Sequence, residues 1–258
     1  NGDLIKTTSF KISSQKSSPF PENISALTLS PDKNRVFSLS LSGQGSVGTL
    51  SNADGTGRKG IFSSSFREWL PSWTSPSLIT LTSKPSALAN GSIYLLSTKT
   101  LTSQIAVASK PGLTGILSPD GKTLVYSEGS RGGMKTSYYS VASGKTVPAP
   151  FTTVPEKCVW STRDVGVIFC AVPTSIPSSE YPDSWYRGDV SFSDAIWKFD
   201  TKDSLDLGHL IISYVPGELI DGVSLALDST ENYLLFLNKK DGALWAIDLS
   251  VAAPVDSD

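Results

Sequence analysis

The chain has 258 residues, a formal net charge of −2 at pH 7, and charged side chains at only 18% of its positions. This length is enough for one large domain with a sizeable core. The slightly acidic balance argues against a nucleic-acid-binding protein, which usually carries a basic patch. No apolar run approaches the roughly 18 residues needed to cross a bilayer. We therefore expect no nucleic-acid partner and no direct membrane insertion.

The chain begins with Asn1 rather than Met, so we interpret it as a processed chain or as a piece of a longer protein. A signal peptide or membrane anchor would then have been lost upstream. The first predicted element is a strand over residues 4–12, LIKTTSFKI.

A strand–turn–strand pattern then recurs along the chain. Taking Pro31, Pro76, Pro119, Thr162 and Ser229 as equivalent turn positions, the successive spacings are 45, 43, 43 and 67 residues. A period of roughly 40–50 residues with four short strands in each repeat is typical of a propeller blade. The five copies are ALTLSPDKNRVFSLS (26–40), PSWTSPSLITLTS (71–83), GILSPDGKTLVYSEG (115–129), CVWSTRDVGVIFCAV (158–172) and SLALDSTENYLLFLN (224–238).

The turns in these copies have a physical rationale. Pro presets φ, Asp accepts hydrogen bonds from nearby backbone amides, and Gly accepts a positive φ. We expect Asp32 and Asp120 to be structural turn residues for this reason.

The segment 118–126, SPDGKTLVY, resembles the WD40-like repeat of TolB-type β-propellers, which also occurs in the propellers of prolyl oligopeptidases. The resemblance covers the whole chain as a repeat, although only the copies at 30–37 and 118–126 carry the motif cleanly. The five repeat copies predict a five-bladed β-propeller as a single domain over 1–258, and the resemblance implies the same all-β propeller fold. It does not imply one activity, because propellers host many functions.

The fifth blade has only three predicted strands before the chain stops. The strand at 4–12 is spare, so we expect it to pair with the fifth blade and close the ring. If the chain is a piece of a longer protein, six blades are the alternative. The predicted blades cover 24–63, 69–108, 113–151, 157–214 and 223–249, with 4–12 completing the last.

Cys158 and Cys170 fall on the two strands of one predicted hairpin, near each other when counted outward from the turn. A disulfide between them would imply an oxidising compartment. Two buried thiols are the alternative. A zinc site is not expected, because no His lies nearby.

The long spacing in the fourth blade is explained by an insertion at 173–194, PTSIPSSEYPDSWYRGDVSFSD. Loops of this length inside compact domains are usually functional or disordered. Tyr181, Trp185, Tyr186 and Arg187 have the composition of a protein interface or a sugar-stacking surface. The alternative is that these aromatic rings fold back and cover their own blade.

Acidic residues stand at or just before the predicted innermost strand of four blades, near the expected rim of the central channel. Three interpretations are open: a solvated structural rim neutralised by Arg67, Lys110 and Lys157, a cation site for Ca²⁺, or the paired carboxylates of a glycoside hydrolase. The four acids are Glu22, Glu68, Glu156 and Asp221.

No catalytic signature accompanies these features. His209 is the sole histidine, and it falls on a predicted outer strand. The sequence lacks a Gly-x-Ser-x-Gly elbow and a phosphate-binding glycine loop. We therefore predict a non-catalytic binding or scaffolding module without a cofactor. It would be a monomeric, extracytoplasmic domain (periplasmic, secreted or cell-surface) that binds a protein or glycan. The alternatives are a carbohydrate-active enzyme that uses the rim carboxylates and a purely structural domain.

Overall fold

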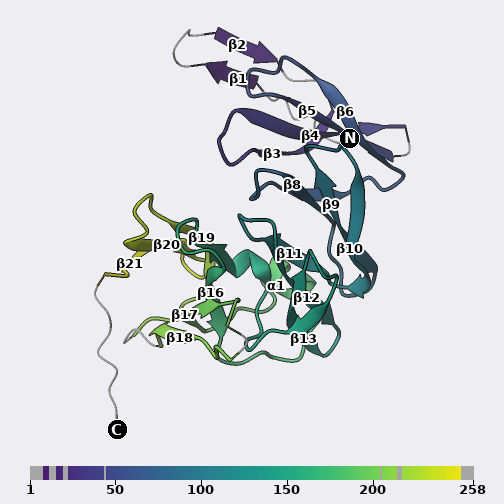
Figure 1. Cartoon of the computed structure of the whole chain (residues 1–258). Helices are drawn as coiled ribbons and strands as arrows, with labels where there is room; N and C mark the ends of the chain where they lie inside the picture. The colour runs from purple at the N-terminus through teal and green to yellow at the C-terminus, as the bar shows by residue number, and fades with distance from the viewer. Residues whose placement is uncertain are drawn as a thin grey trace. The chain divides into compact units, whose positions relative to one another are not determined.

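The structure is a computed structural model that describes residues 8–11, 16–19, 23–43, 45–203, 205–213 and 217–250, the first two ranges as backbone only. Its contacts group the chain into two compact units (Figure 1). The first unit comprises residues 1–84 and 91–109, and the second comprises 85–90 and 110–258.

The first unit contains one hairpin and two sheets, each built from consecutive antiparallel strands. The hairpin is β1 (Thr8–Lys11) with β2 (Lys16–Pro19). Blade one is β3 (Ile24–Leu29), β4 (Arg35–Ser42), β5 (Gly45–Asn52) and β6 (Lys59–Ser64). Blade two is β7 (Trp69–Ser72), β8 (Leu78–Ser83), β9 (Asn90–Ser97) and β10 (Ser103–Pro111). The first residue of β9 and the last two residues of β10 belong to the second unit.

The second unit contains three further sheets. Blade three is β11 (Thr114–Leu117), β12 (Thr123–Ser130), β13 (Gly133–Ser140) and β14 (Thr146–Pro148). Blade four is β15 (Cys158–Trp160), β16 (Val167–Pro173), β17 (Asp194–Asp200) and β18 (His209–Ile212). Blade five is β19 (Gly222–Leu227), β20 (Tyr233–Asn238) and β21 (Leu244–Asp248).

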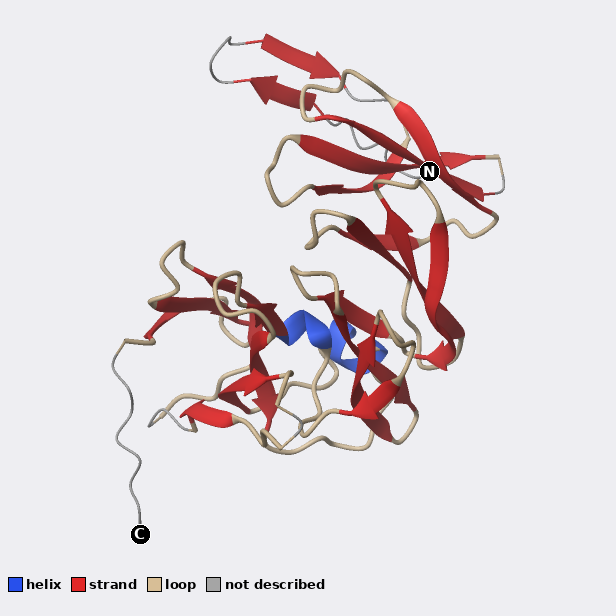
Figure 2. Cartoon of the chain, viewed as in Figure 1, coloured by secondary structure: helices blue, strands red, loops and turns tan. Residues whose placement is uncertain are grey.

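The chain is thus all-β, with antiparallel sheets of three or four strands that correspond to the five blades of a propeller (Figure 2). The sequence-based fold class is confirmed, and so is the insertion between the second and third strands of blade four. Helical structure in the described residues is confined to a 3₁₀ turn, η1 (Pro155–Lys157), and the five-residue helix α1 (Asp183–Arg187). Neither approaches the length of a membrane-spanning helix.

The predicted strand at 4–12 pairs differently from our expectation. Its described part, β1, pairs with β2 in a separate two-stranded sheet, and β19–β21 remain a sheet of three strands. The prediction that this strand completes blade five is therefore wrong for the described residues. The physical reason is proximity along the chain, because pairing neighbouring segments closes a much smaller loop than pairing opposite ends.

Each unit has its own apolar core. In the first, Phe37, Leu39, Trp69, Ile79 and Leu81 pack together, all at most 5% exposed. In the second, one cluster joins blades four and five and another joins blades three and four. Side chains alternate between the two faces of each strand, so the apolar side chains of one face pack against the neighbouring blade, as in a propeller.

The Ser-Pro-Asp turns are structural, as predicted. The Ser30 hydroxyl donates to Asp32 at 2.5 Å and accepts the Arg35 amide at 2.9 Å. Ser118 repeats the arrangement, donating to Asp120 at 2.6 Å. These hydrogen bonds hold the pKa of Asp120 below its usual value despite partial burial.

The corresponding turn of blade four has no aspartate two residues after its serine, and a carboxylate of blade five accepts the hydrogen bonds instead. The Ser161 hydroxyl donates to Glu231 Oε2 at 2.5 Å, and the Thr162 amide donates to Glu231 Oε1 at 2.7 Å. The turn of blade five thus caps the turn of blade four, which ties the two blades together at their ends.

Cys158 and Cys170 are direct partners across β15 and β16 and form a disulfide, with Cα atoms 4.1 Å apart. The disulfide interpretation is confirmed over that of two free thiols. It links the innermost strand of blade four to its neighbour, immediately beside η1.

Candidate functional site

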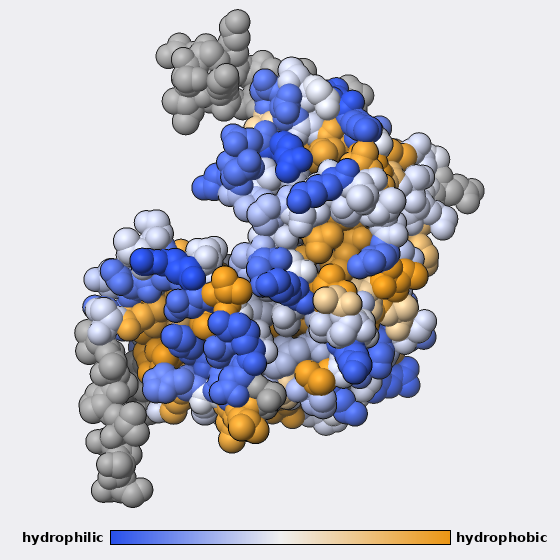
Figure 3. All heavy atoms as spheres, in the orientation of Figure 1, coloured by the Kyte–Doolittle hydropathy of each residue, from blue (hydrophilic) through white to orange (hydrophobic). Residues whose placement is uncertain are grey.

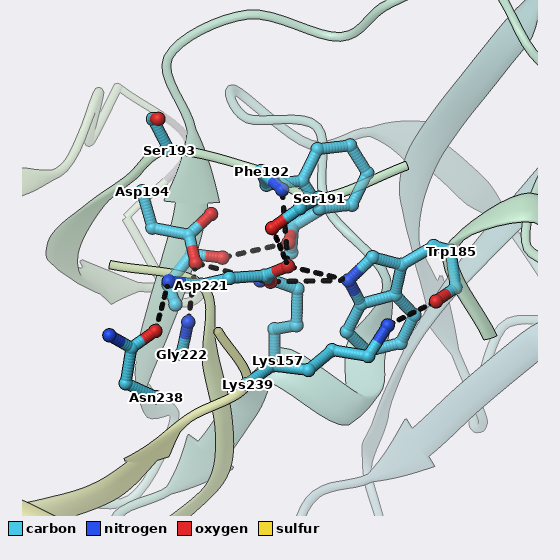
Figure 4. Close-up of polar contacts among 12 residues, drawn as sticks. Lys157, Trp185, Ser191, Phe192, Ser193, Asp194, Asp221, Gly222, Asn238 and Lys239 are labelled. Atoms are coloured by element: carbon cyan, nitrogen blue, oxygen red, sulfur yellow. Dashed lines mark hydrogen bonds and ion pairs between the residues drawn. The ribbon is translucent and has the colours of Figure 1, made fainter. Parts of the chain in front are cut away.

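The blade-four insertion is fixed to the second unit by a buried ion cluster, shown in Figure 4. Lys157, the last residue of η1, has a side chain that is 0% exposed. Its Nζ lies 2.7 Å from Asp194 Oδ2 and 2.5 Å from Asp221 Oδ1, and both carboxylates are also 0% exposed. Three separate elements, η1, the start of β17 and the residue before β19, therefore meet at one ammonium group.

Asp221 also binds the insertion directly. The indole Nε1 of Trp185 donates to both of its carboxylate oxygens, at 3.1 and 3.2 Å. The Ser191 hydroxyl and the Phe192 amide donate to Asp221 Oδ2 at 3.0 and 3.1 Å. One carboxylate thus holds both ends of the segment 185–192, and buried charge-assisted hydrogen bonds of this kind fix geometry strongly.

Asp194 and Asp221 share the single Lys157 ammonium, and their environments shift their pKa values in opposite directions. Burial would raise the pKa of Asp221, but Lys157 and the donated hydrogen bonds outweigh it and hold that pKa below its usual value. Burial raises the pKa of Asp194 to about 6, against the attraction of Lys157 and the hydrogen bond from Gly222. Asp194 Oδ1 is buried and has no hydrogen-bond partner among the described residues. Asp194 is therefore the member of the cluster poised to take up a proton.

The insertion also packs closely against blade three. A Cβ placed on Gly112 or Gly129 would lie within 2.3 Å of the Tyr181 carbonyl oxygen, so only glycine fits at either position. Gly112 additionally has φ of +56°. The Asp183 carboxylate accepts the Ala87 amide at 2.6 Å, which ties the start of α1 to the segment 85–90. The insertion is therefore built into the second unit.

The four predicted contact residues of the insertion divide into two pairs. Tyr181 is 0% exposed and Trp185 is 4% exposed, and they pack with Phe192 and Val154 in a small core. These two rings cover their own blades, so they do not form the exposed aromatic surface that we predicted. Tyr186, by contrast, is 43% exposed, and the Arg187 side chain is 55% exposed.

The predicted rim acids that the structure describes have different partners. Glu68 lies in the first unit and pairs with Lys84 at 2.8 Å, with the two side chains 66% and 62% exposed. Asp221 is buried in the Lys157 cluster, and Glu22 lies outside the described residues. Of the predicted neutralising cations, Lys157 binds Asp221 as proposed, whereas Lys110 pairs with Glu128 at 2.8 Å.

Glu156 is the rim acid that meets the insertion. Its carboxylate accepts a hydrogen bond from the Tyr186 hydroxyl. Although the residue retains solvent exposure, its carboxyl group lies against Tyr186, and this local burial raises the pKa of Glu156. Burial and the neighbouring carboxylate likewise raise the pKa of Tyr186. The pair presents an exposed ring and a carboxylate at the end of a fixed helix.

No group of three or more His, Cys, Asp or Glu side chains in the described part of the chain has metal-binding geometry. Asp221 is bound to Lys157 and Glu68 to Lys84, so each of these two predicted rim acids has a lysine partner.

Sequence reasoning missed the importance of Lys157 and Asp194. Both were visible, since Lys157 interrupts the mostly apolar run VPEKCVW and Asp194 ends the insertion. A lysine amid apolar residues at the start of an innermost strand is a signal for a buried ion pair, because a lone buried ammonium is too costly.

No protein-family model matches the sequence, and no curated protein matches it. Solved structures do match. TolB from Acinetobacter baumannii is 15% identical with a TM-score of 0.57, and the match covers 94% of this chain and 57% of that chain. The β-propeller domain of the Trilobed protease from Pyrococcus furiosus is 14% identical with a TM-score of 0.62, over 95% and 72% of the two chains.

A third match is an oligogalacturonate lyase in complex with manganese, at 10% identity and a TM-score of 0.59, over 93% of this chain and 69% of that one. At such identities the likeness shows the fold alone. The resemblance to TolB-type propellers is thus confirmed as a fold, while the chain spans little more than half of the TolB structure. The other two structures belong to a protease and to a lyase, so these matches do not select a function.

Proposed function

We propose that the chain is a non-catalytic binding or scaffolding propeller that acts outside the cytoplasm, as part of a longer periplasmic or cell-surface protein. The observation that carries the proposal is the anchored insertion. The Lys157 cluster fixes a segment whose end exposes Tyr186 and Arg187. Tyrosine and arginine are the residue types enriched in binding hot spots, and a rigidly held loop loses little entropy on binding.

The contact surface in this proposal consists of Tyr186, Arg187 and Glu156. Tyr181 and Trp185 support it from beneath and do not touch the ligand. A protein or a glycan suits this composition, because an exposed ring stacks on either and the charged groups give orientation. The Cys158–Cys170 disulfide supports an oxidising, extracytoplasmic location.

A binding screen with matched variants tests the proposal. The chain is applied to a glycan array and to a peptide-display library, and each hit is measured by biolayer interferometry with wild type and with the double variant Tyr186→Ala/Arg187→Ala. Loss of two hot-spot side chains is expected to weaken binding at least about tenfold. Tyr233→Ala is the matched control, since this tyrosine is 47% exposed on blade five. Equal binding by wild type and the double variant would refute the proposed surface, and the absence of any hit would favour a purely structural role.

A carbohydrate-active enzyme is the second candidate, favoured by one contact: the Tyr186 hydroxyl donates to the Glu156 carboxylate at the exposed end of α1, and burial against this ring raises the pKa of Glu156 in the direction that a general acid requires. Such an enzyme needs a second carboxylate roughly 5–9.5 Å away, and Asp221 is enclosed and bound to Lys157. Release of reducing sugar from a polysaccharide panel, abolished in Glu156→Gln, would support this candidate over the binding module.

A further inference from the structure

Two carboxylates lie close to the exposed ring of Tyr186. Glu156 accepts a hydrogen bond from the Tyr186 hydroxyl, and Asp183 lies one turn before the tyrosine in α1. Burial raises the pKa of Tyr186, and the negative charges of Glu156 and Asp183 add to that shift. Asp183 accepts the Ala87 amide, which is a neutral donor. Neither carboxylate has an ion-pair partner in the part of the chain that the structure describes, so no lysine or arginine there neutralises either charge.

The cations around the insertion, by contrast, have partners of their own. The pairs are Arg187 with Asp189 at 2.8 Å, Arg131 with Glu180 at 3.5 Å, and Lys157 with both Asp194 and Asp221. Lys239 donates to the Trp185 carbonyl and offsets the excess negative charge of the Lys157 cluster. The surroundings of Tyr186 therefore remain negative by the charges of Glu156 and Asp183, and charge complementarity selects a cationic ligand.

An exposed apolar side chain follows the residue that Asp183 binds. The Asp183 carboxylate holds the Ala87 amide at 2.6 Å, and the next residue, Leu88, is 63% exposed. On the face that Figure 3 draws, hydrophilic and hydrophobic residues are likewise interspersed over the second unit. A ring, a leucine and two carboxylates on one surface suit a protein partner that carries a basic and an apolar side chain close together.

The groups of this surface are held in place before a ligand binds. Lys157, the neighbour of Glu156 in η1, is fixed in the buried ion cluster. Trp185, the neighbour of Tyr186 in α1, is fixed by its hydrogen bonds to Asp221. The ring and the carboxylate therefore keep their relative positions, and preorganisation of this kind reduces the entropy that is lost on binding.

We propose that this surface binds an arginine side chain of a partner protein. The inference rests on the proposed binding function and names the chemistry of the partner. The guanidinium group stacks on the exposed ring of Tyr186 and pairs with Glu156, while Asp183 adds to the attraction. Arginine suits the surface better than lysine, because its planar group stacks on a ring and pairs with a carboxylate at once. A neutral glycan would desolvate both carboxylates without supplying a cation, which is costly.

Three matched peptides test the guanidinium group without knowledge of the partner. The probe is fluorescein-labelled Gly-Ser-Leu-Arg-Leu-Ser-Gly, and the two controls replace its arginine by citrulline, which keeps the shape and loses the charge, or by lysine. In fluorescence anisotropy at low ionic strength, the arginine peptide is expected to bind at least about tenfold more tightly than the citrulline peptide, a difference of about 1.4 kcal/mol. Equal binding of these two peptides, or of neither, would overturn the proposal. Lysine binding as tightly as arginine would overturn the assignment to a guanidinium group.

Variants of the surface test where the arginine binds. Glu156→Gln and Tyr186→Leu are each expected to abolish the preference for arginine over citrulline, whereas Tyr186→Phe, which keeps a ring, retains most of it. Glu218→Gln is the matched control, because Glu218 is an exposed acid of the second unit. A preference that survives in Glu156→Gln and Tyr186→Leu would place the arginine elsewhere and overturn the proposal.

The outcomes also separate this inference from the proposed function on which it rests. Ligands without arginine that bind wild type and are lost in Tyr186→Ala/Arg187→Ala would overturn the arginine assignment and leave the binding surface standing. Ligands that bind wild type and this double variant equally would overturn both.

Discussion

Glu68 and Asp221 stand at the same place in the repeat, each directly before the innermost strand of its blade, and their surroundings are opposite. Glu68 pairs with Lys84 at the surface, with both side chains more than half exposed. Asp221 pairs with Lys157 at 0% exposure and accepts three further donors from the insertion. The two carboxylates thus have the same position in the repeat. The blade-four insertion covers Asp221 and makes it a buried anchor, whereas Glu68 remains a solvated charge.

The largest expected effect comes from removing each partner lysine. Lys157→Met leaves two buried carboxylates without their cation, and breaking a buried ion pair in this way typically costs about 3–5 kcal/mol. Lys84→Met removes an exposed pair that is worth less than about 1 kcal/mol. Urea denaturation followed by circular dichroism measures both free energies of unfolding. Similar small losses in the two variants would contradict the anchoring role of Lys157.

The pH dependence of stability separates the two carboxylates of the cluster. Asp194 has a folded-state pKa of about 6 against an ordinary value of 3.8, so the folded state binds the proton first. Stability is therefore expected to rise as the pH falls from 7 toward 4, by up to on the order of 3 kcal/mol at about 1.4 kcal/mol per pKa unit. Asp221 acts in the opposite sense, because its pKa is lowered and its stabilisation is lost below pH 4.

Asp194→Asn provides the control for this pH dependence. The amide oxygen still accepts from Lys157 and Gly222, while the excess negative charge is removed. We expect the variant to show a flatter stability profile between pH 4 and 7 than wild type in urea titrations at several pH values. A profile as steep as that of wild type would assign the dependence to another group.

A smaller effect is expected at Trp185. Trp185→Phe keeps an aromatic ring and removes the Nε1 donor to Asp221, and a hydrogen bond to a charged group contributes about 1.5–3 kcal/mol. Trp160→Phe is the matched control, because Trp160 is 5% exposed and its Nε1 has no partner among the described residues. Hydrogen exchange at residues 183–187 is expected to accelerate only in the first variant. Equal acceleration in both would show that ring volume, not the hydrogen bond, holds the insertion.

The features that sequence predicted are those encoded by local chemistry. The Ser30 and Ser118 turns carry their own Asp partner two residues away, and the disulfide joins directly paired positions of a hairpin. The unequal repeat spacing located the insertion. These inferences need only strand alternation and turn geometry, both of which extend over a few residues.

The features that sequence missed depend on distant partners. Lys157 meets Asp221 64 residues away, and Ser161 meets Glu231 70 residues away. Nothing local to Tyr181 or Trp185 distinguishes a ring that covers its own core from one that faces a ligand. The helix α1 has five residues, which is too few to produce a periodic pattern. The predicted pairing of the N-terminal strand with blade five is wrong for its described part, residues 8–11, because the edge of blade five suggested a partner and the neighbouring strand β2 was not considered.

The smallest effect is expected at Glu68 itself, and it completes the comparison with Asp221. Glu68→Gln removes one member of an exposed ion pair, so the free energy of unfolding should fall by less than about 1 kcal/mol at low salt, and by less still at 1 M NaCl, where screening weakens exposed pairs. Asp221→Asn should retain most of its loss at both salt concentrations, because buried pairs are screened much less. Urea titrations of both variants at the two salt concentrations measure this difference. A salt-insensitive loss at Glu68 would mean that its carboxylate is held by more than Lys84, and the interpretation of the first-unit acid as a solvated rim charge would then fail.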